Sequence, residues 1–255
     1  MFTFPELTEC VSTESNVSNV SNASSSADTI TFDFNDDSNL KERVNITEDH
    51  QLHSMMKEIL KQEKELKKDV TIQYLQKPNI NVLIQQRNDL TKIIYYIYTE
   101  YNFSRLTYFL SINMVDRVLN ECNITDFDGI LLGTSIIHLA SKYYEIDSIN
   151  SPTHKLLINS NYVYNGYNLR EQIINLEKDI IGALNYKISV PNAYNVAQIL
   201  LKYHYKYHNK LSKITKTEQF SENVYLYLEQ CIKIPAFKTM LPSKLAKNAI
   251  KLFIK

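Results

Sequence analysis

Glycine is scarce in this sequence, which holds only four glycines, six prolines and no tryptophan among its 255 residues. The tight turns of a many-stranded sheet depend on glycine and proline, so their shortage weighs against a β-rich fold. Hydrophobic residues make up 44% of the chain, which is enough to fill a large core. The composition therefore predicts an all-α protein.

Cysteine is also rare, because Cys10, Cys122 and Cys231 are the only three and lie more than a hundred residues apart. This odd number and wide spacing fit neither a disulfide framework nor a zinc ribbon, so we expect a reducing compartment and no metal site. The sequence also lacks a basic and apolar leader and any run of about 20 apolar residues. We therefore expect an intracellular protein that does not contact a membrane.

Basic residues are missing from the start of the chain, where Lys41 is the first and seven acidic residues precede it. The same segment is rich in Ser, Thr, Asn and Asp and includes the short repeat NVSNVSNAS. So little apolar surface cannot offset the entropy of ordering, which predicts a disordered acidic tail over residues 1–47. The rest of the chain has a basic excess that is spread out, so the charge does not indicate a nucleic-acid partner.

Residues 48–79 are predicted to form one amphipathic helix and a linker. Leu52 begins a set of apolar residues at helical spacing, and a stretch of mixed charge separates the set from Pro78. The pattern then repeats in a series of helices. The first is marked by Leu90, Ile93, Ile94, Ile97 and Tyr101, and the second opens at Ser104, a favourable N-cap.

The third predicted helix, which starts near Thr125 or Asp126, reads ILLGTSIIHLASKYY and is apolar or small on every side. A helix without a polar stripe has to be surrounded by other helices, so we expect it at the centre of the domain. Gly133 within it predicts a close helix contact. A short fourth helix is expected near 153–160, and a fifth begins at Asn168 with Glu171 at the capping-box position.

Pro191 closes this set of five helices, and three more are predicted at 192–208, 221–232 and 243–254. Residues 86–188 resemble the cyclin box. The motifs that carry the resemblance follow one another in the family's order: QRNDL and EYNF, NMVDRVL, GTSIIHLASKYYEI and LEKDIIGALNYKISVP. Upstream, LHSMMKEI and YLQKPNI resemble the N-terminal helix and linker of mitotic, A- or B-type, cyclins.

The resemblance implies a five-helix cyclin box over residues 80–190 and a truncated second cyclin-like unit over 191–255. It also implies a regulatory subunit that has no catalytic residues and no cofactor, that activates a cyclin-dependent serine/threonine kinase in cell division, and that resides in nucleus and cytoplasm. Such a kinase needs an ion pair between a strand lysine and a glutamate on its mobile helix C. A cyclin holds that helix in place.

The kinase-binding residues are implied by the resemblance alone. Lys142 and Glu177 match the family's pair that bonds to the backbone of helix C, and both are expected on the surface. The surrounding contact positions fall on Leu139, Tyr143, Glu145, Ile146, Ile181, Tyr186, Ile188 and, from the N-terminal helix, Leu52.

Two further family features have counterparts here. Arg87 and Asp116 match a structural ion pair between the first two helices of the box. The groove that docks protein substrates falls on Gln86, Asp89, Leu90, Ile93 and Ile130. Gln86 and Asp89 are polar where the family is apolar, which weighs against docking of Arg-x-Leu motifs. The tail also offers only Arg43-Val-Asn-Ile46 as a near match to a destruction signal.

Three other functions stay open at this point. A metalloenzyme has its best support in His204 and His208, spaced i, i+4, but a zinc site needs three or four ligands. A cyclin-fold transcription factor is suggested by the stripe of Lys244, Lys247, Lys251 and Lys255, although such stripes are usually a solvated helix face. An adaptor without kinase activation is suggested by the short second unit.

Overall fold

The computed structural model describes residues 46–69, 79–121, 128–146, 151–160, 163–164, 166–207 and 217–253, and the part from His50 to Lys255 forms one compact unit. Residues 1–45 of the predicted tail and residues 70–78 lie outside the described residues, whereas Ile46 and Thr47, which were predicted to belong to the tail, lie in the first helix. Within these described ranges the regular structure is helical except for one pair of two-residue strands, which agrees with the all-α prediction. No described helix is both long and apolar enough to cross a membrane.

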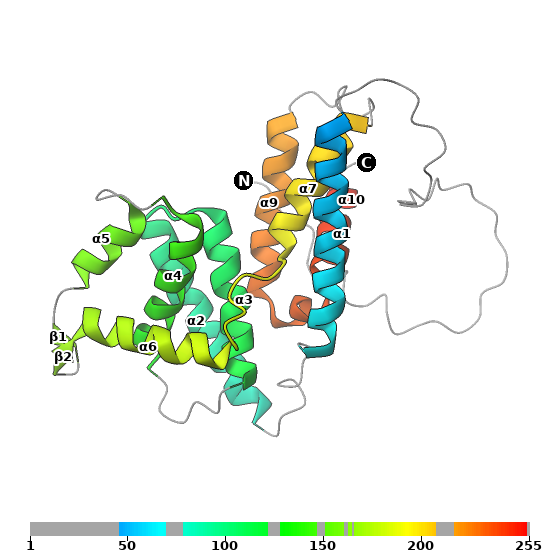
Figure 1. The fold of residues 1–255 in the computed structure, drawn as a ribbon. Coiled ribbons are helices and arrows are strands. Elements are labelled where there is room, and N and C mark those ends of the chain that lie inside the picture. The colour runs from blue at the N-terminus through cyan, green and yellow to red at the C-terminus, as the bar shows by residue number, and fades with distance from the viewer. Residues whose placement is uncertain are drawn as a thin grey trace. The chain divides into compact units, whose positions relative to one another are not determined.

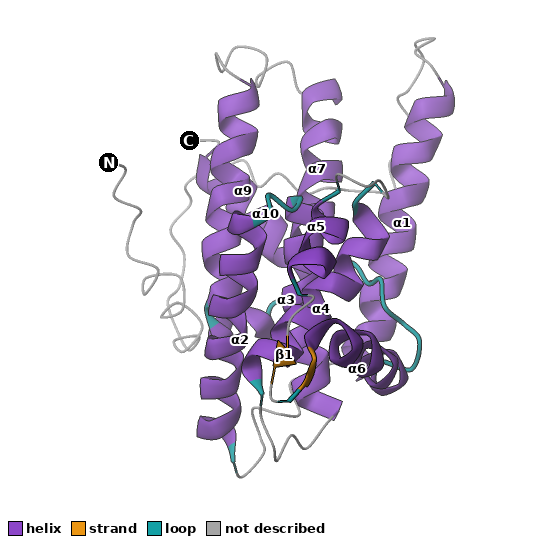
Figure 2. Cartoon of the chain, turned by 90° about the vertical axis from the view of Figure 1, so that its left-hand side faces the viewer, coloured by secondary structure: helices purple, strands orange, loops and turns teal. Residues whose placement is uncertain are grey.

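The cyclin-box region consists of five helices, with α4 in contact with the other four (Figures 1 and 2). The bounds are α2, Ile80–Glu100; α3, Arg105–Glu121; α4, Gly129–Tyr144; α5, Pro152–Asn159; and α6, Leu169–Ala183. Every residue of α4 from Leu132 to Ser141 is buried. The central position predicted for this helix is therefore confirmed, because its apolar surface leaves no side for water.

Local caps decide where these helices begin. The Asp128 carboxylate accepts a hydrogen bond from the Leu131 N–H at 3.0 Å, so α4 begins at Gly129 and not near Thr125 or Asp126 as predicted. The predicted caps at Ser104 and Asn168 are confirmed, since Ser104 Oγ accepts from the Thr107 N–H and Asn168 Oδ1 from the Glu171 N–H. Ser151, which was not predicted, caps α5.

Gly133 lets α2 approach α4. A Cβ atom added at this position would lie 2.9 Å from Ile93 Cγ2, which is closer than two carbon atoms can pack without a shift. The predicted close contact is thus present, and Ile93 is its partner.

Three helices after Pro191 pack on one another: α7, Ala193–Tyr207; α9, Thr217–Lys233; and α10, Pro242–Phe253. A 3-10 helix, η4, Pro235–Thr239, precedes α10 and was not predicted, and α9 begins four residues before the predicted start at 221. Strands β1, Val163–Tyr164, and β2, Tyr167–Asn168, form an unpredicted antiparallel pair. The proposed division of the chain into domains at residue 191 stays a prediction.

Two arginines connect the box to these later helices. Arg87 Nε lies 2.7 Å from Asp116 Oδ1, and its other nitrogens donate to the carbonyls of Ile232 and Lys233 at the end of α9. Arg105 Nε lies 2.6 Å from Glu229 Oε1, and Arg105 also pairs with Glu222. The family pair Arg87–Asp116 therefore joins three helices, since the guanidinium also satisfies carbonyls that the helix end leaves unbonded.

Helix α1, Ile46–Asp69, runs beside α7 and α10 and away from α4 and α6 (Figure 1). Its buried Glu63 accepts hydrogen bonds from the N–H and the hydroxyl of Ser243, at 2.6 and 2.7 Å. A carboxylate at the first turn of α10 satisfies a backbone donor that the helix itself leaves unpaired. Helix α1 thereby caps the last helix, a role that the sequence did not indicate.

Replacing two helical glycines by alanine should separate packing from helix propensity. Gly182→Ala adds a methyl group where nothing lies within 4 Å, so it should raise the free energy of unfolding by about 0.5–1 kcal/mol. Gly133→Ala should leave the free energy of unfolding unchanged or lower it, because Ile93 has to move to make room for the added methyl group. Urea denaturation measures both, and adding Ile93→Ala to Gly133→Ala should remove the clash. Equal gains for the two single variants would contradict the close contact.

Arg87→Ala should lower the free energy of unfolding by about 3–5 kcal/mol, because it leaves the buried Asp116 carboxylate without its cation. Arg170→Ala, a change of the same kind on the exposed side of α6, should cost less than about 0.5 kcal/mol. Thermal and urea unfolding check both. A loss for Arg87→Ala as small as that for Arg170→Ala would show that the ion pair contributes little.

Candidate functional site

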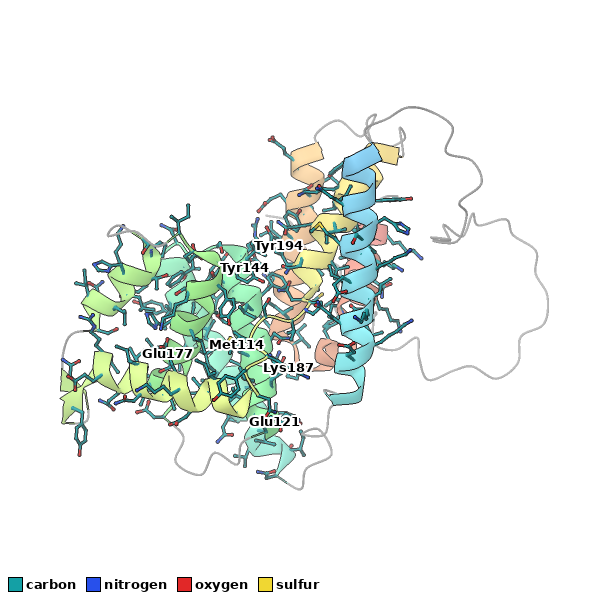
Figure 3. The ribbon with its side chains drawn as sticks, viewed as in Figure 1. Met114, Glu121, Tyr144, Glu177, Lys187 and Tyr194 are labelled. Atoms are coloured by element: carbon teal, nitrogen blue, oxygen red, sulfur yellow. The ribbon has the colours of Figure 1, made fainter. Side chains whose placement is uncertain are left out.

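A buried carboxylate meets two nitrogen donors where α6 faces α4. Glu177, which is labelled in Figure 3, belongs to α6. Its Oε2 lies 2.6 Å from Lys142 Nζ and its Oε1 lies 2.5 Å from His138 Nδ1. Both donors come from α4 and are spaced i, i+4, so they project from the same side of that helix. The structure thus brings together the two residues that the family resemblance singled out, and it adds His138.

The expectation that both charged residues lie on the surface is wrong for Glu177. Its side chain is 5% exposed, whereas that of Lys142 is 45% exposed. The reason lies in the periodicity of α6, whose buried residues are Leu169, Ile173, Glu177 and Ile180. Glu177 therefore occupies the stripe that packs against α4, while the neighbouring Leu176 is only half-buried.

The environment keeps this carboxylate ionised. Burial by itself raises the pKa of Glu177, but the hydrogen bonds from His138 and Lys142 and the charges of these residues outweigh burial and lower the pKa below its ordinary value. A carboxylate that is paired and bonded on both oxygens can remain in a protein interior. The site is therefore a buried anion with one cation beside it that reaches solvent.

His138 is completely buried and was not singled out from the sequence. Because Glu177 Oε1 accepts, Nδ1 must carry a proton and donate to it. The other ring nitrogen, Nε2, is buried and has no hydrogen-bond partner in the described part of the chain. The only signal in the sequence is an ionisable residue inside the otherwise apolar run ILLGTSIIHLA.

Exposed apolar side chains surround the end of α4 and the end of α6. Ile146 is 85% exposed and Tyr186 is 81% exposed, and Tyr143 is also on the surface. Tyr186 has a φ of 60°, in the left-handed region, and its N–H donates to the Ile181 carbonyl at 3.0 Å, which ends α6 in a tight turn. We call Lys142, Tyr143, Ile146 and Tyr186 the α4–α6 face.

Several predicted contact residues have other surroundings. Leu139 and Ile188 are buried in the core and offer no surface to a partner in this conformation. The Glu145 carboxylate accepts from Ser104 N at 2.8 Å and Thr107 Oγ1 at 2.5 Å, so it caps the start of α3. Ile181 is half-buried, as is Leu52 on α1, which Figure 1 places away from α4 and α6.

The residues that match the family's substrate groove do not line an open apolar surface. Leu90 and Gln86 are buried, and Ile93 packs against Gly133. Asp89 accepts a hydrogen bond from Gln85 and lies 3.8 Å from Lys92. Of the five, only Ile130 is both apolar and well exposed.

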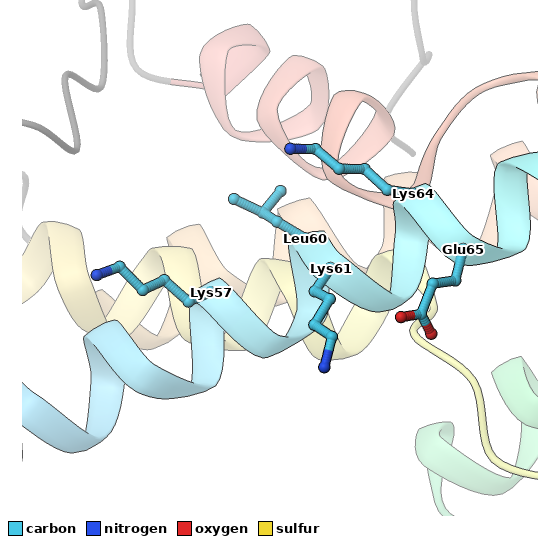
Figure 4. Close-up of a pocket in the computed structure, with 5 residues that line it drawn as sticks. All are labelled: Lys57, Leu60, Lys61, Lys64 and Glu65. Atoms are coloured by element: carbon cyan, nitrogen blue, oxygen red, sulfur yellow. The ribbon is translucent and has the colours of Figure 1, made fainter.

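A hollow of about 430 Å³ lies along α1 (Figure 4). Its lining contains one apolar side chain among charged ones: Lys57, Leu60, Lys61, Lys64 and Glu65. The sequence did not predict this hollow, and none of its lining residues belongs to α4 or α6.

The histidine pair and the lysine stripe, which suggested a metalloenzyme and a transcription factor, lie only in part within the described residues. The His204 side chain, His208 and Lys255 lie outside the described residues, and Lys247 of α10 is half-buried. Within the described ranges, no three His, Cys, Asp or Glu side chains come together in a way that suits a metal ion.

Both the sequence and the fold of this chain are similar to those of known proteins. Residues 52–189 match the family described as cyclin, N-terminal domain. Cyclin-B1-1 of Oryza sativa subsp. japonica is 28% identical over 144 residues, which are 56% of this chain and 30% of the rice protein. G2/mitotic-specific cyclin-2 of Antirrhinum majus is 34% identical over 98 residues, 38% of this chain and 21% of the relative. The matches thus span about a third or less of these relatives.

The fold is similar to that of a viral cyclin from herpesvirus saimiri, with a TM-score of 0.54 and 18% sequence identity over 68% of this chain and 70% of that one. This likeness shows the fold, and the family match covers more than half of the chain. The B-type and mitotic names of these relatives agree with the mitotic resemblance in the sequence. This chain belongs to the cyclin family and resembles its mitotic members.

Proposed function

We propose that this chain is a regulatory subunit that binds a cyclin-dependent serine/threonine kinase through the α4–α6 face and activates it by holding helix C in its active position. The Lys142–Glu177 pair carries this proposal. The chain acts as an activator and has no catalytic residues of its own. Its protein substrates, its role in cell-cycle progression and its place in nucleus and cytoplasm are parts of the same proposal.

The chemistry of the pair suits the end of a partner's helix. Lys142 is the last basic residue of α4, its Nζ is 2.6 Å from Glu177, and its side chain is nearly half exposed. An ammonium has three N–H donors, and Glu177 uses one of them. The remaining donors suit backbone carbonyls, such as those a helix leaves unbonded at its C-terminus.

Glu177 has a different part in this proposal from the one that the resemblance implied. Because its side chain is 5% exposed, it offers a partner almost no surface. It is an anion that holds Lys142 in one orientation and lowers the entropy that the lysine loses on binding. Ile146, just past the end of α4, and Tyr186, just past the end of α6, are exposed and provide apolar area that a kinase helix can bury.

Lys142→Ala should weaken kinase binding by about 1.5–3 kcal/mol, or roughly 10- to 100-fold, because a charged hydrogen bond at the contact is lost. Kinase activation should fall in proportion at subsaturating concentrations. Titration calorimetry and phosphorylation of a peptide substrate measure the two effects. Lys155→Ala on exposed α5 is the matched control and should behave as the unchanged chain does. Full activation by Lys142→Ala would refute the proposal.

Ile146→Ser should weaken kinase binding by about 1–2 kcal/mol through lost apolar contact, with little change in the free energy of unfolding, because the side chain is 85% exposed. Ile158→Ser removes the same side chain from an exposed position on α5 and serves as the control. Surface plasmon resonance with immobilised kinase gives both affinities. If Ile158→Ser costs as much as Ile146→Ser, the α4–α6 face is not the binding surface.

A further inference from the structure

The buried imidazole of His138 bonds to the one anion on which the α4–α6 face depends. Glu177 has two carboxylate oxygens, and each has a single described donor: Lys142 Nζ on Oε2 and His138 Nδ1 on Oε1. Lysine is long and its side chain is 45% exposed, so it cannot by itself hold the carboxylate in one orientation. The rigid, fully buried ring can do so, because its own position is set by the packing of α4.

Core packing alone does not explain a histidine at this position. Its neighbours Ile136, Ile137, Leu139 and Ala140 are apolar and buried, and a leucine would fill the space without burying a polar atom. The ring instead leaves Nε2 buried without a partner among the described residues. A buried unsatisfied atom is unfavourable, so it calls for a compensating interaction. Among the described residues, the hydrogen bond of this ring is the one from Nδ1 to Glu177.

We propose that His138 is a positioning residue for kinase binding: it orients the Glu177 carboxylate, which in turn holds Lys142 toward the partner. This proposal rests on the proposed function, because its effect on the kinase passes through Lys142. His138 does not touch the partner, since its ring is fully buried between α4 and α6. The imidazole ring of His138 therefore orients the Glu177 carboxylate, the carboxylate orients the Lys142 ammonium, and the ammonium contacts the partner.

Three substitutions at this position test the direction of the hydrogen bond. Asparagine places an amide N–H near the position that Nδ1 of the histidine occupies, and glutamine places one near the position of Nε2. Leucine has no donor. In the full-length chain, His138→Leu and His138→Gln should weaken kinase binding about five- to tenfold, whereas His138→Asn should stay within about twofold of the unchanged chain. Should the leucine variant not fold, the comparison of asparagine with glutamine still decides.

A double-mutant cycle distinguishes positioning from a general loss of structure. In a Lys142→Ala background, replacing His138 by glutamine should change kinase affinity less than about twofold, because there is no lysine left to orient. An undiminished effect in that background would overturn the proposal. Ser135→Ala, another buried polar residue of α4, is the control and should leave the affinity unchanged.

A measurement without kinase keeps this proposal separate from the proposed function. Carbon-13 NMR titration of the Glu177 carboxyl group in the full chain should give a pKa below its ordinary value. In His138→Gln this pKa should be higher than in the unchanged chain, and in His138→Asn it should be close to that of the unchanged chain. If the titration follows this pattern but no kinase binds, the proposed function fails while the orienting bond stands. If the titration is the same in all three proteins, His138 does not orient Glu177.

Discussion

The burial of α4 on all sides is the constraint on which the rest of this structure depends. A helix with no polar stripe has to be enclosed, and α2, α3, α5 and α6 enclose it. The glycine at position 133 lets α2 approach, and the i, i+4 spacing of His138 and Lys142 aims both side chains at α6. The enclosure therefore brings a carboxylate from another helix into contact with two nitrogens.

Charged residues inside the protein link the elements that apolar packing brings together. Arg87 pairs with Asp116 and also binds two carbonyls at the end of α9, and Glu63 of α1 caps α10. Each of these groups is buried and bonded, as a buried charge has to be if it is not to destabilise the fold. The same condition applies to Glu177, whose lowered pKa reflects its two donors.

The family resemblance singled out Lys142 and Glu177 and implied that both lie on the surface, which the structure contradicts for Glu177. Lys142 extends from the last turn of α4 into solvent, whereas Glu177 lies in the buried stripe of α6. Leu139 and Ile188, which share the same stretches of sequence, point into the core. The surface that we propose for a partner therefore consists of fewer residues than the resemblance implied: Lys142, Tyr143, Ile146 and Tyr186.

The sequence by itself determined the all-α class, the central helix and the caps at Ser104 and Asn168, because periodicity and capping chemistry are local properties of the chain. Its family motifs also singled out Lys142 and Glu177, whose side chains meet in the structure. It did not determine which side of α6 faces α4, the role of His138, or the bonds of Glu63 and Arg87 to residues more than 140 positions away. These depend on which helices meet, and only the tertiary packing decides that, since a buried charge finds its partner in space and not along the sequence.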